Sequence, residues 1–98
     1  MTLRTDRDAI ELMSEARDGM VVIPVERLDD DFFRLKTGVA GAFIQKFVTY
    51  GRRLVVVGDI SAFLEESSAL RDFVYEANRG DHVWFVENLE ELERRLEK

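Results

Sequence analysis

One segment, residues 35–59, constrains the fold more than any other part of the chain. Its sequence is LKTGVAGAFIQKFVTYGRRLVVVGD. Apolar residues at three-and-four spacing predict a helix that opens at Thr37, with an inward stripe of Ala40, Phe43, Ile44 and Phe47. Gly51 is placed to end that helix in the left-handed conformation. The run RLVVVGD, residues 53–59, then predicts a strand buried on both faces, which is typical of a parallel α/β sheet.

The residues before this segment predict another helix and another strand. Residues 5–18 carry an apolar stripe at helical spacing, with Thr5 or Asp6 as the N-cap. The stripe consists of Ala9, Ile10, Leu12, Met13 and Ala16. The run MVVIPV, residues 20–25, predicts a buried strand with Pro24 at its end, because proline has no N–H to donate to a neighbouring strand.

The residues after this segment predict helical stretches around a third strand. Ser61 is placed to cap a first helical turn, and Ser67 or Ser68 to cap a longer helix. The inward face of that helix consists of Leu70, Phe73, Val74 and Ala77. Residues 82–87, HVWFVE, predict the strand, and Asn88 then caps a final helix. The apolar stripe of this last helix consists of Leu89, Leu92 and Leu96.

The predicted order is αβαβαβα in a single α/β domain, residues 1–98. Strands joined through helices run parallel with right-handed crossovers, so we expect a parallel sheet of about three strands. Both faces of this sheet are apolar, and so few helices can cover only one of them well. The second face therefore needs the first helix, a partner subunit or both, and we expect a homodimer.

The composition excludes several classes of function. The chain has 98 residues, a formal net charge of -6 and no cysteine. The negative charge argues against nucleic-acid binding, because phosphate recognition needs clustered Lys and Arg. The lack of cysteine excludes a disulfide scaffold and thiolate chemistry. No apolar stretch reaches the length of a signal peptide or a membrane span, so we expect a cytoplasmic protein that does not bind membranes.

Polar residues are predicted to gather at the carboxyl ends of the strands, where parallel α/β sheets bind their ligands. These candidate ligand-binding residues are Thr37, Asp59, Ser61 and Asn88. Asp59 could bind a ligand hydroxyl or a cation, and the alternative interpretation is a turn-forming aspartate. Thr37 could carry a phosphoryl group beside Lys36 at a helix start, and the alternative is an unmodified N-cap threonine.

A second polar cluster lies on the predicted helix that contains Leu70, on the face away from its apolar stripe. Its candidate partner-binding residues are Arg71, Tyr75, Glu76, Asn78 and Arg79. One interpretation is an exposed network with Asp72, which stabilises the helix by about 0.2–0.5 kcal/mol per pair. The other interpretation is a surface that docks a protein partner.

The catalytic motifs are incomplete. Lys36-Thr37-Gly38 matches a triplet of penicillin-binding proteins and serine β-lactamases, but the Ser-x-x-Lys partner of that triplet is absent. His82 is the only histidine, so it has no companion for a metal cluster or a catalytic triad. We therefore expect no metal and no cofactor, and we favour a protein that is not an enzyme.

Residues 31–80 resemble a known family. They contain the blocks DFF-LKTG-AG, QKF--Y, VGD and LRDF-YE-NRG in the order found in the uncharacterised bacterial domain-of-unknown-function family 4180. This resemblance implies a small cytoplasmic α/β protein of unknown activity. Family members usually carry an extra N-terminal β-hairpin, which this chain lacks or reduces to residues 2–4. The open sheet edge that results adds to the expectation of a homodimer.

A more distant similarity is to STAS domains, the fold of anti-sigma-factor antagonists. In those domains a buried strand leads through Asp-Ser-Ser-Gly into a helix, and Leu35-Lys36-Thr37-Gly38 falls at that place here. Only Thr37 keeps a hydroxyl in this motif. Together, these patterns predict a STAS-like, non-catalytic interaction or regulatory module. The alternative is a small-ligand-binding protein or minor enzyme that uses the carboxyl edge of the sheet.

Overall fold

A computed structural model describes residue 10 and residues 19–97 of the chain. The predicted first helix and residues 2–4 therefore lie outside the described residues, apart from Ile10. We expected Ile10 to lie on the apolar stripe of that helix. Ile10 is helical, as predicted, and it is 42 % exposed.

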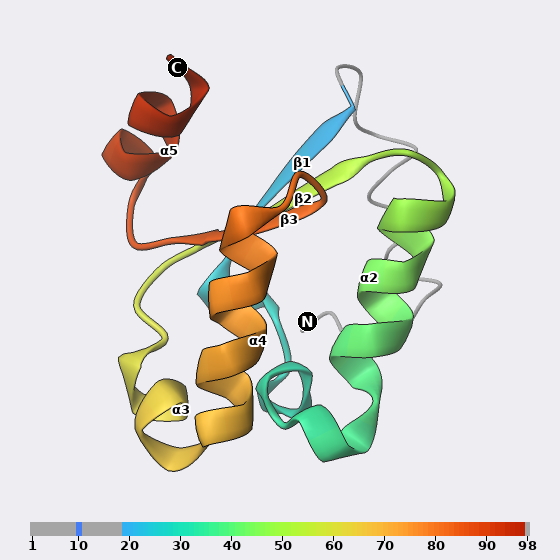
Figure 1. Cartoon of the computed structure of the whole chain (residues 1–98), viewed down its shortest axis with the longest axis vertical. Helices are drawn as coiled ribbons and strands as arrows, with labels where there is room; N and C mark the ends of the chain where they lie inside the picture. Colours follow the sequence, from blue (N-terminus) through green and yellow to red (C-terminus); the bar gives the residue numbers. More distant parts are fainter. Residues whose placement is uncertain (1–9, 11–18, 98) are drawn as a thin grey trace.

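The described residues form a three-stranded parallel sheet, which confirms the predicted fold class. The strands β1 (Met20–Pro24), β2 (Arg53–Val57) and β3 (Val83–Val86) lie side by side in that order (Figure 1). Each strand is shorter than its predicted range. In the register, Ile23 pairs with Val56, which in turn pairs with Phe85. β1 and β3 are therefore the edge strands of this sheet.

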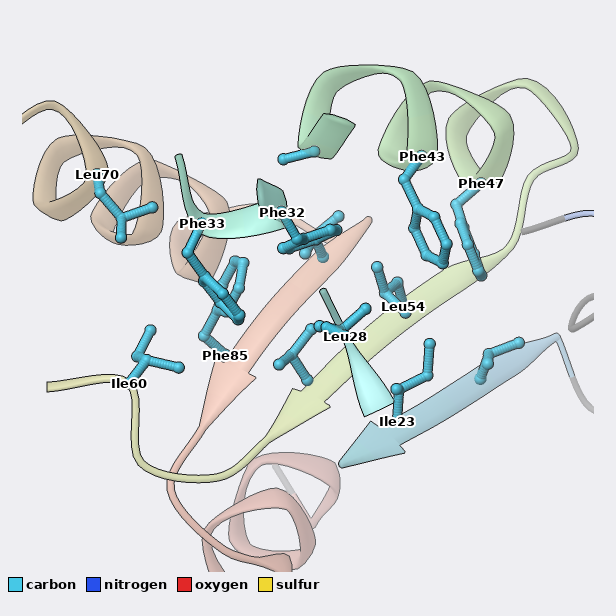
Figure 2. Packing of buried hydrophobic residues seen from close by; sticks show 14 residues of the cluster. Ile23, Leu28, Phe32, Phe33, Phe43, Phe47, Leu54, Ile60, Leu70 and Phe85 are labelled. Carbon is cyan, nitrogen blue, oxygen red and sulfur yellow. The ribbon is translucent and has the colours of Figure 1, made fainter. Parts of the chain in front are cut away.

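Helices lie on both faces of the sheet (Figure 2). One face, which we call the front face, is covered by α2 (Val39–Thr49), α3 (Ser61–Glu66) and α4 (Ser68–Arg79). The opposite face, which we call the rear face, is covered by α5 (Leu89–Leu96). Between β1 and α2 the chain forms three short 3-10 turns: η1 (Val25–Arg27), η2 (Asp30–Phe33) and η3 (Leu35–Thr37). Within the described part of the chain, no helix has the length and apolar character needed to cross a bilayer.

The main core lies between the front face and its helices. Phe32 and Phe33, from η2, point into the space between α2 and α4 (Figure 2). The ring of Phe32 meets that of Phe43 edge-on at 5.6 Å, and Phe33 stacks on Phe63 of α3 at 4.5 Å. Full burial of a Phe side chain stabilises a fold by about 1.5–3 kcal/mol. The η2 turn therefore holds the front helices at their spacing.

A smaller core lies on the rear face around Trp84, which is the only tryptophan of the chain. The guanidinium groups of Arg53 and Arg95 lie over its indole ring, 4.3 Å and 4.2 Å from the centroid. The indole N–H donates a hydrogen bond of 2.8 Å to the carbonyl oxygen of Gly80. The buried residues of this core are Val55, Trp84, Val86 and Leu92.

The α5 helix differs from its prediction. Leu92 is buried, but Leu89 and Leu96 are exposed, so the predicted inward stripe is wrong for these two residues. The helix is anchored instead by Leu92 and by Arg95, whose guanidinium also donates to the carbonyl oxygen of Asn78 at 2.7 Å. The contacts of α5 described here therefore come from a single turn of the helix.

Three predicted helix ends are confirmed. Gly51 follows α2 with a φ of +66°, a conformation that glycine adopts without steric cost. The hydroxyl of Ser67 accepts a backbone hydrogen bond of 3.1 Å at the start of α4, and the amide oxygen of Asn88 accepts one of 2.9 Å at the start of α5. Each side chain satisfies an N–H that the helix itself leaves without a partner.

Two other predicted helix starts need correction. Ser61 does not cap α3, because it is already the first helical residue and Ile60 holds the cap position. The carboxylate of Asp59 accepts the N–H of Ser61 instead, at 2.9 Å. The α2 helix likewise has Gly38 at its cap position rather than Thr37.

Candidate functional site

An apolar groove opens between α2 and α4. It has a volume of about 290 Å³ and lies where the chain enters β3, since residues 80–83 form part of its wall. Its lining consists of Ile44, Phe73, Glu76, Ala77, Gly80, Asp81, His82 and Val83.

The walls and the rim of the groove differ in chemistry. Ile44 of α2 and Phe73 of α4 form half-buried apolar walls, and the small side chain of Ala77 also lines the groove. Glu76 and Asp81 are exposed at the rim, together with His82. Such a groove can bury an apolar side chain, and its rim places two carboxylates beside that side chain.

Three residues of the predicted partner-binding cluster face solvent on α4. Tyr75 is 63 % exposed. The guanidinium of Arg79 lies 5.6 Å from the centre of the Tyr75 ring and 3.9 Å from the carboxylate of Glu76. Pairs of this kind on an exposed helix face contribute about 0.2–1 kcal/mol. Glu76 connects this exposed face to the groove, because it also lines the groove rim.

The other two residues of the predicted cluster have structural contacts. Arg71 donates a hydrogen bond to the carbonyl oxygen of Leu64, which ties α4 to the end of α3. Asn78 is half-buried, and its amide oxygen accepts the backbone N–H of Phe85 at 2.7 Å. These contacts tie α4 to its neighbours. Arg71 is nevertheless exposed, so the exposed part of the cluster consists of Arg71, Tyr75, Glu76 and Arg79.

A separate cavity lies at the carboxyl ends of β2 and β3, where candidate ligand residues were predicted. Its volume is about 240 Å³. Asp59 and Ser61 line it, whereas Thr37 and Asn88 are not among the lining residues. The sequence did not single out most of the lining, which consists of Gly58, Asp59, Ile60, Ser61, Leu64, Val74, Asn78, Phe85, Val86, Glu87 and Glu91.

Thr37 and Asn88 have local roles in the structure. The hydroxyl of Thr37 lies 2.8 Å from the carbonyl oxygens of both Asp31 and Arg34, and it accepts the N–H of Val39 at 3.3 Å. These bonds hold the turn that leads into α2. Asn88 caps α5, as described above.

Asp59 is the one described residue at this edge with a clearly shifted acidity. The hydrogen bond from the backbone N–H of Ser61, and next the Ser61 side chain, hold the pKa of Asp59 below its ordinary value of 3.8. Both bonds favour the ionised carboxylate. Asp59 is therefore negatively charged at neutral pH.

Metal ligands do not converge in the described residues. No group of three or more His, Asp or Glu side chains is placed there to hold a metal ion. Asp59, Glu87 and Glu91 surround the cavity without meeting at one point that could coordinate such an ion. His82 lines the apolar groove instead.

Comparison with family models identifies the family of this domain. A family model described as "Domain of unknown function (DUF4180)" matches residues 1–96. The chain belongs to the DUF4180 family. This membership confirms the family resemblance carried by residues 31–80 and extends it over nearly the whole chain. No curated protein matches the chain, and no solved structure matches it.

Proposed function

We propose that this DUF4180 domain is a non-catalytic interaction module of the cytoplasm. In this proposal it docks an amphipathic helix of a partner protein, with basic residues beside its apolar anchors, in the groove between α2 and α4. The observation that carries the proposal is the open apolar groove itself, with its walls of Ile44, Phe73 and Ala77.

The charge of the domain supports a basic partner. Glu76 and Asp81 are the acidic residues of the groove rim, and the whole chain has a net charge of -6. A Lys or Arg next to an apolar anchor would therefore meet opposite charge as the anchor enters the groove. A second copy of this acidic chain would meet like charge at the same place.

The dimensions of the groove support a helical segment. Helices dock in grooves through anchors at spacings of about three, four and seven residues, which lie on one helix face. The volume of about 290 Å³ suits a few apolar side chains rather than a whole protein face. Tyr75, which is exposed beside Glu76, adds an aromatic contact of the kind that is enriched at interfaces.

The similarity to STAS domains adds a regulatory element to this proposal. The turn η3 leads into α2 and places the exposed Thr37 beside Lys36. Phosphorylation of Thr37 would replace the hydroxyl proton that Thr37 now donates to the carbonyl oxygens of Asp31 and Arg34. Modification there would therefore change the turn at the start of a helix that forms one wall of the groove.

The proposal can be tested with a model partner of known chemistry. The probe is a fluorescein-labelled helical peptide of about 14 residues, with Leu on one face and Lys on the other. Fluorescence anisotropy measures its binding to the full chain at low salt. Glu76→Lys with Asp81→Lys reverses both rim charges, and Glu65→Lys with Glu66→Lys on α3 is the matched control with the same net charge.

We expect saturable binding to the wild type, with a Kd about tenfold higher for the rim pair and less than about twofold higher for the α3 pair. Equal weakening by both pairs would indicate attraction to net charge alone and would contradict docking at the groove. Absence of saturable binding would contradict it as well.

A further inference from the structure

The cavity at the carboxyl ends of β2 and β3 is separate from the groove. The two lie on different sides of α4, since Phe73 and Ala77 line the groove while Val74 and Asn78 line the cavity. Its volume of about 240 Å³ equals that of about eight water molecules. It is therefore large enough for a small organic molecule and too small for a nucleotide.

The inner walls of the cavity are apolar. Leu64 and Val74 come from the two helices α3 and α4, and Phe85 comes from β3. All three also contact the front core, which holds them in place. These walls favour a ligand with a compact hydrocarbon body, because they give a polar ligand no hydrogen bonds.

Asn78 adds one defined polar group to the walls. Its amide oxygen is engaged by the backbone N–H of Phe85 at 2.7 Å, and this bond fixes which end of the amide is the oxygen. The NH₂ group is the donor that remains, and no acceptor in the described part of the chain takes a bond from it. This donor can bind an acceptor group of a ligand, but not an ammonium group, which has no lone pair.

The charged residues of the lining are all acidic. They are Asp59, Glu87 and Glu91, and the lining contains no Lys, Arg or His. An anionic ligand would be repelled here. A metal ion lacks a point of convergence among these carboxylates, as noted above, whereas an organic cation needs only the summed negative field and an apolar contact for its body.

We propose that this cavity binds a small primary or secondary organic amine in its ammonium form. The ammonium group lies among the carboxylates of Asp59, Glu87 and Glu91, and the hydrocarbon body lies against Leu64, Val74 and Phe85. This is a binding site for a small molecule in addition to the partner-docking groove, and neither site depends on the other.

Cyclohexylamine is a suitable probe, because it combines a compact ring with a charged ammonium group at neutral pH. Cyclohexanol is the matched neutral probe of nearly the same shape. The ¹⁵N chemical shifts of the full chain are followed during titration with each compound. We expect saturable shifts at residues 58–64, 78 and 85–91 with the amine, and none at equal concentrations of the alcohol.

The charge assignment is tested with three isosteric variants. Asp59→Asn keeps an oxygen that can accept the Ser61 N–H, so it removes the charge and preserves the turn. The other two variants are Glu87→Gln and Glu91→Gln. Each of the three single variants should raise the Kd for cyclohexylamine about threefold. Glu93→Gln, an exposed carboxylate of α5 that does not line the cavity, should leave it unchanged.

Two results would overturn this proposal. One is equal binding of the alcohol and the amine, which would mean that the carboxylates do not select a cation. The other is shifts that map outside the cavity or do not saturate. In either case the groove experiment with the basic peptide remains independent, because it uses a different probe and variants at Glu76 and Asp81.

Discussion

The side-chain amide of Asn78 on α4 closes the free edge of β3. Its oxygen lies 2.7 Å from the backbone nitrogen of Phe85. The N–H of Leu54 in β2 donates to the carbonyl oxygen of His82, and the N–H of Gly58 donates to that of Val86. Because alternate residues of β3 face β2, the N–H of Phe85 points away from the sheet. Without Asn78, an edge strand would present an open donor to another chain.

Replacement of Asn78 should therefore destabilise the domain. Asn78→Ala leaves the Phe85 N–H without its partner, and we expect a loss of about 1–3 kcal/mol in the free energy of unfolding, measured by urea denaturation. Asn78→Asp keeps an acceptor at that position and should lose less. An equal loss in both variants would show that the bond to Phe85 is not the cause.

Gly58 should tolerate no side chain. Its φ of +143° is strained for other residues, and an added Cβ would lie 2.7 Å from Cγ2 of Val25. Gly58→Ala should lower the free energy of unfolding by more than about 1 kcal/mol. Val25→Ala in the same chain removes the Cγ2 contact but keeps a Cβ at 2.9 Å, so it should restore only a fraction of the loss.

Gly41 is the matched control for this prediction, because an added Cβ there meets nothing within 4 Å. It lies inside α2, so Gly41→Ala should stabilise the domain by about 0.4–1 kcal/mol. Thermal or urea denaturation checks both variants. A gain in stability for Gly58→Ala would contradict the geometry at the end of β2.

The acidity of Asp59 predicts a pH dependence of stability. Because its pKa is lowered in the folded state, its contribution is present above its ordinary value of 3.8 and is lost as the pH falls through the lower folded pKa. Asp59→Asn lacks this contribution. The difference in urea midpoint between wild type and variant should therefore be present at neutral pH and shrink in acid. A difference that grows in acid would contradict the lowered pKa.

The homodimer expected from the sequence remains a prediction, and β1 is the place where the described structure would allow it. β1 is an edge strand, and Val22 is 39 % exposed on it. Sedimentation equilibrium should give twice the chain mass of 11.4 kDa for the wild type. Val22→Lys should shift that mass toward the monomer, because a charge on an edge strand opposes pairing. A measured mass equal to that of one wild-type chain would contradict the predicted homodimer.

The fold was predictable because its strongest signals are local. The run RLVVV can bury its apolar side chains only as a strand covered on both faces, and it forms β2. Gly51, Ser67 and Asn88 act within a few residues of their own position, so their roles could be read from the sequence. The helix-to-strand alternation around them then required a parallel sheet.

The errors arise where several residues compete for one role. Asp59 and Ser61 are both good acceptors near the start of α3, and only the path of the turn decides that Asp59 accepts the bond. Leu89 and Leu96 have helical spacing with Leu92, but α5 contacts the rear face near one turn, so two of the three are exposed. The spacing of apolar residues predicts an apolar stripe, but it does not show how many residues of that stripe contact the rest of the domain.

The candidate sites were harder to predict than the elements. The groove combines Ile44 of α2 with Phe73 of α4 and Val83 of β3, so its shape depends on how three elements pack together. The cavity needs Asn78 from α4 beside Glu87, which follows β3. The topological rule for strand ends located Asp59 and Ser61 but could not supply these neighbours, because they depend on how α4 packs on the sheet.

The most direct test of the central proposal is to map the basic amphipathic peptide on the full chain by ¹⁵N chemical-shift perturbation. We expect saturable shifts that cluster at Ile44, Phe73, Ala77 and residues 80–83, with Tyr75 and Glu76 at their border. Shifts that cluster instead on α5 or around residues 58–61, or that spread over all acidic surfaces, would contradict docking in the groove between α2 and α4.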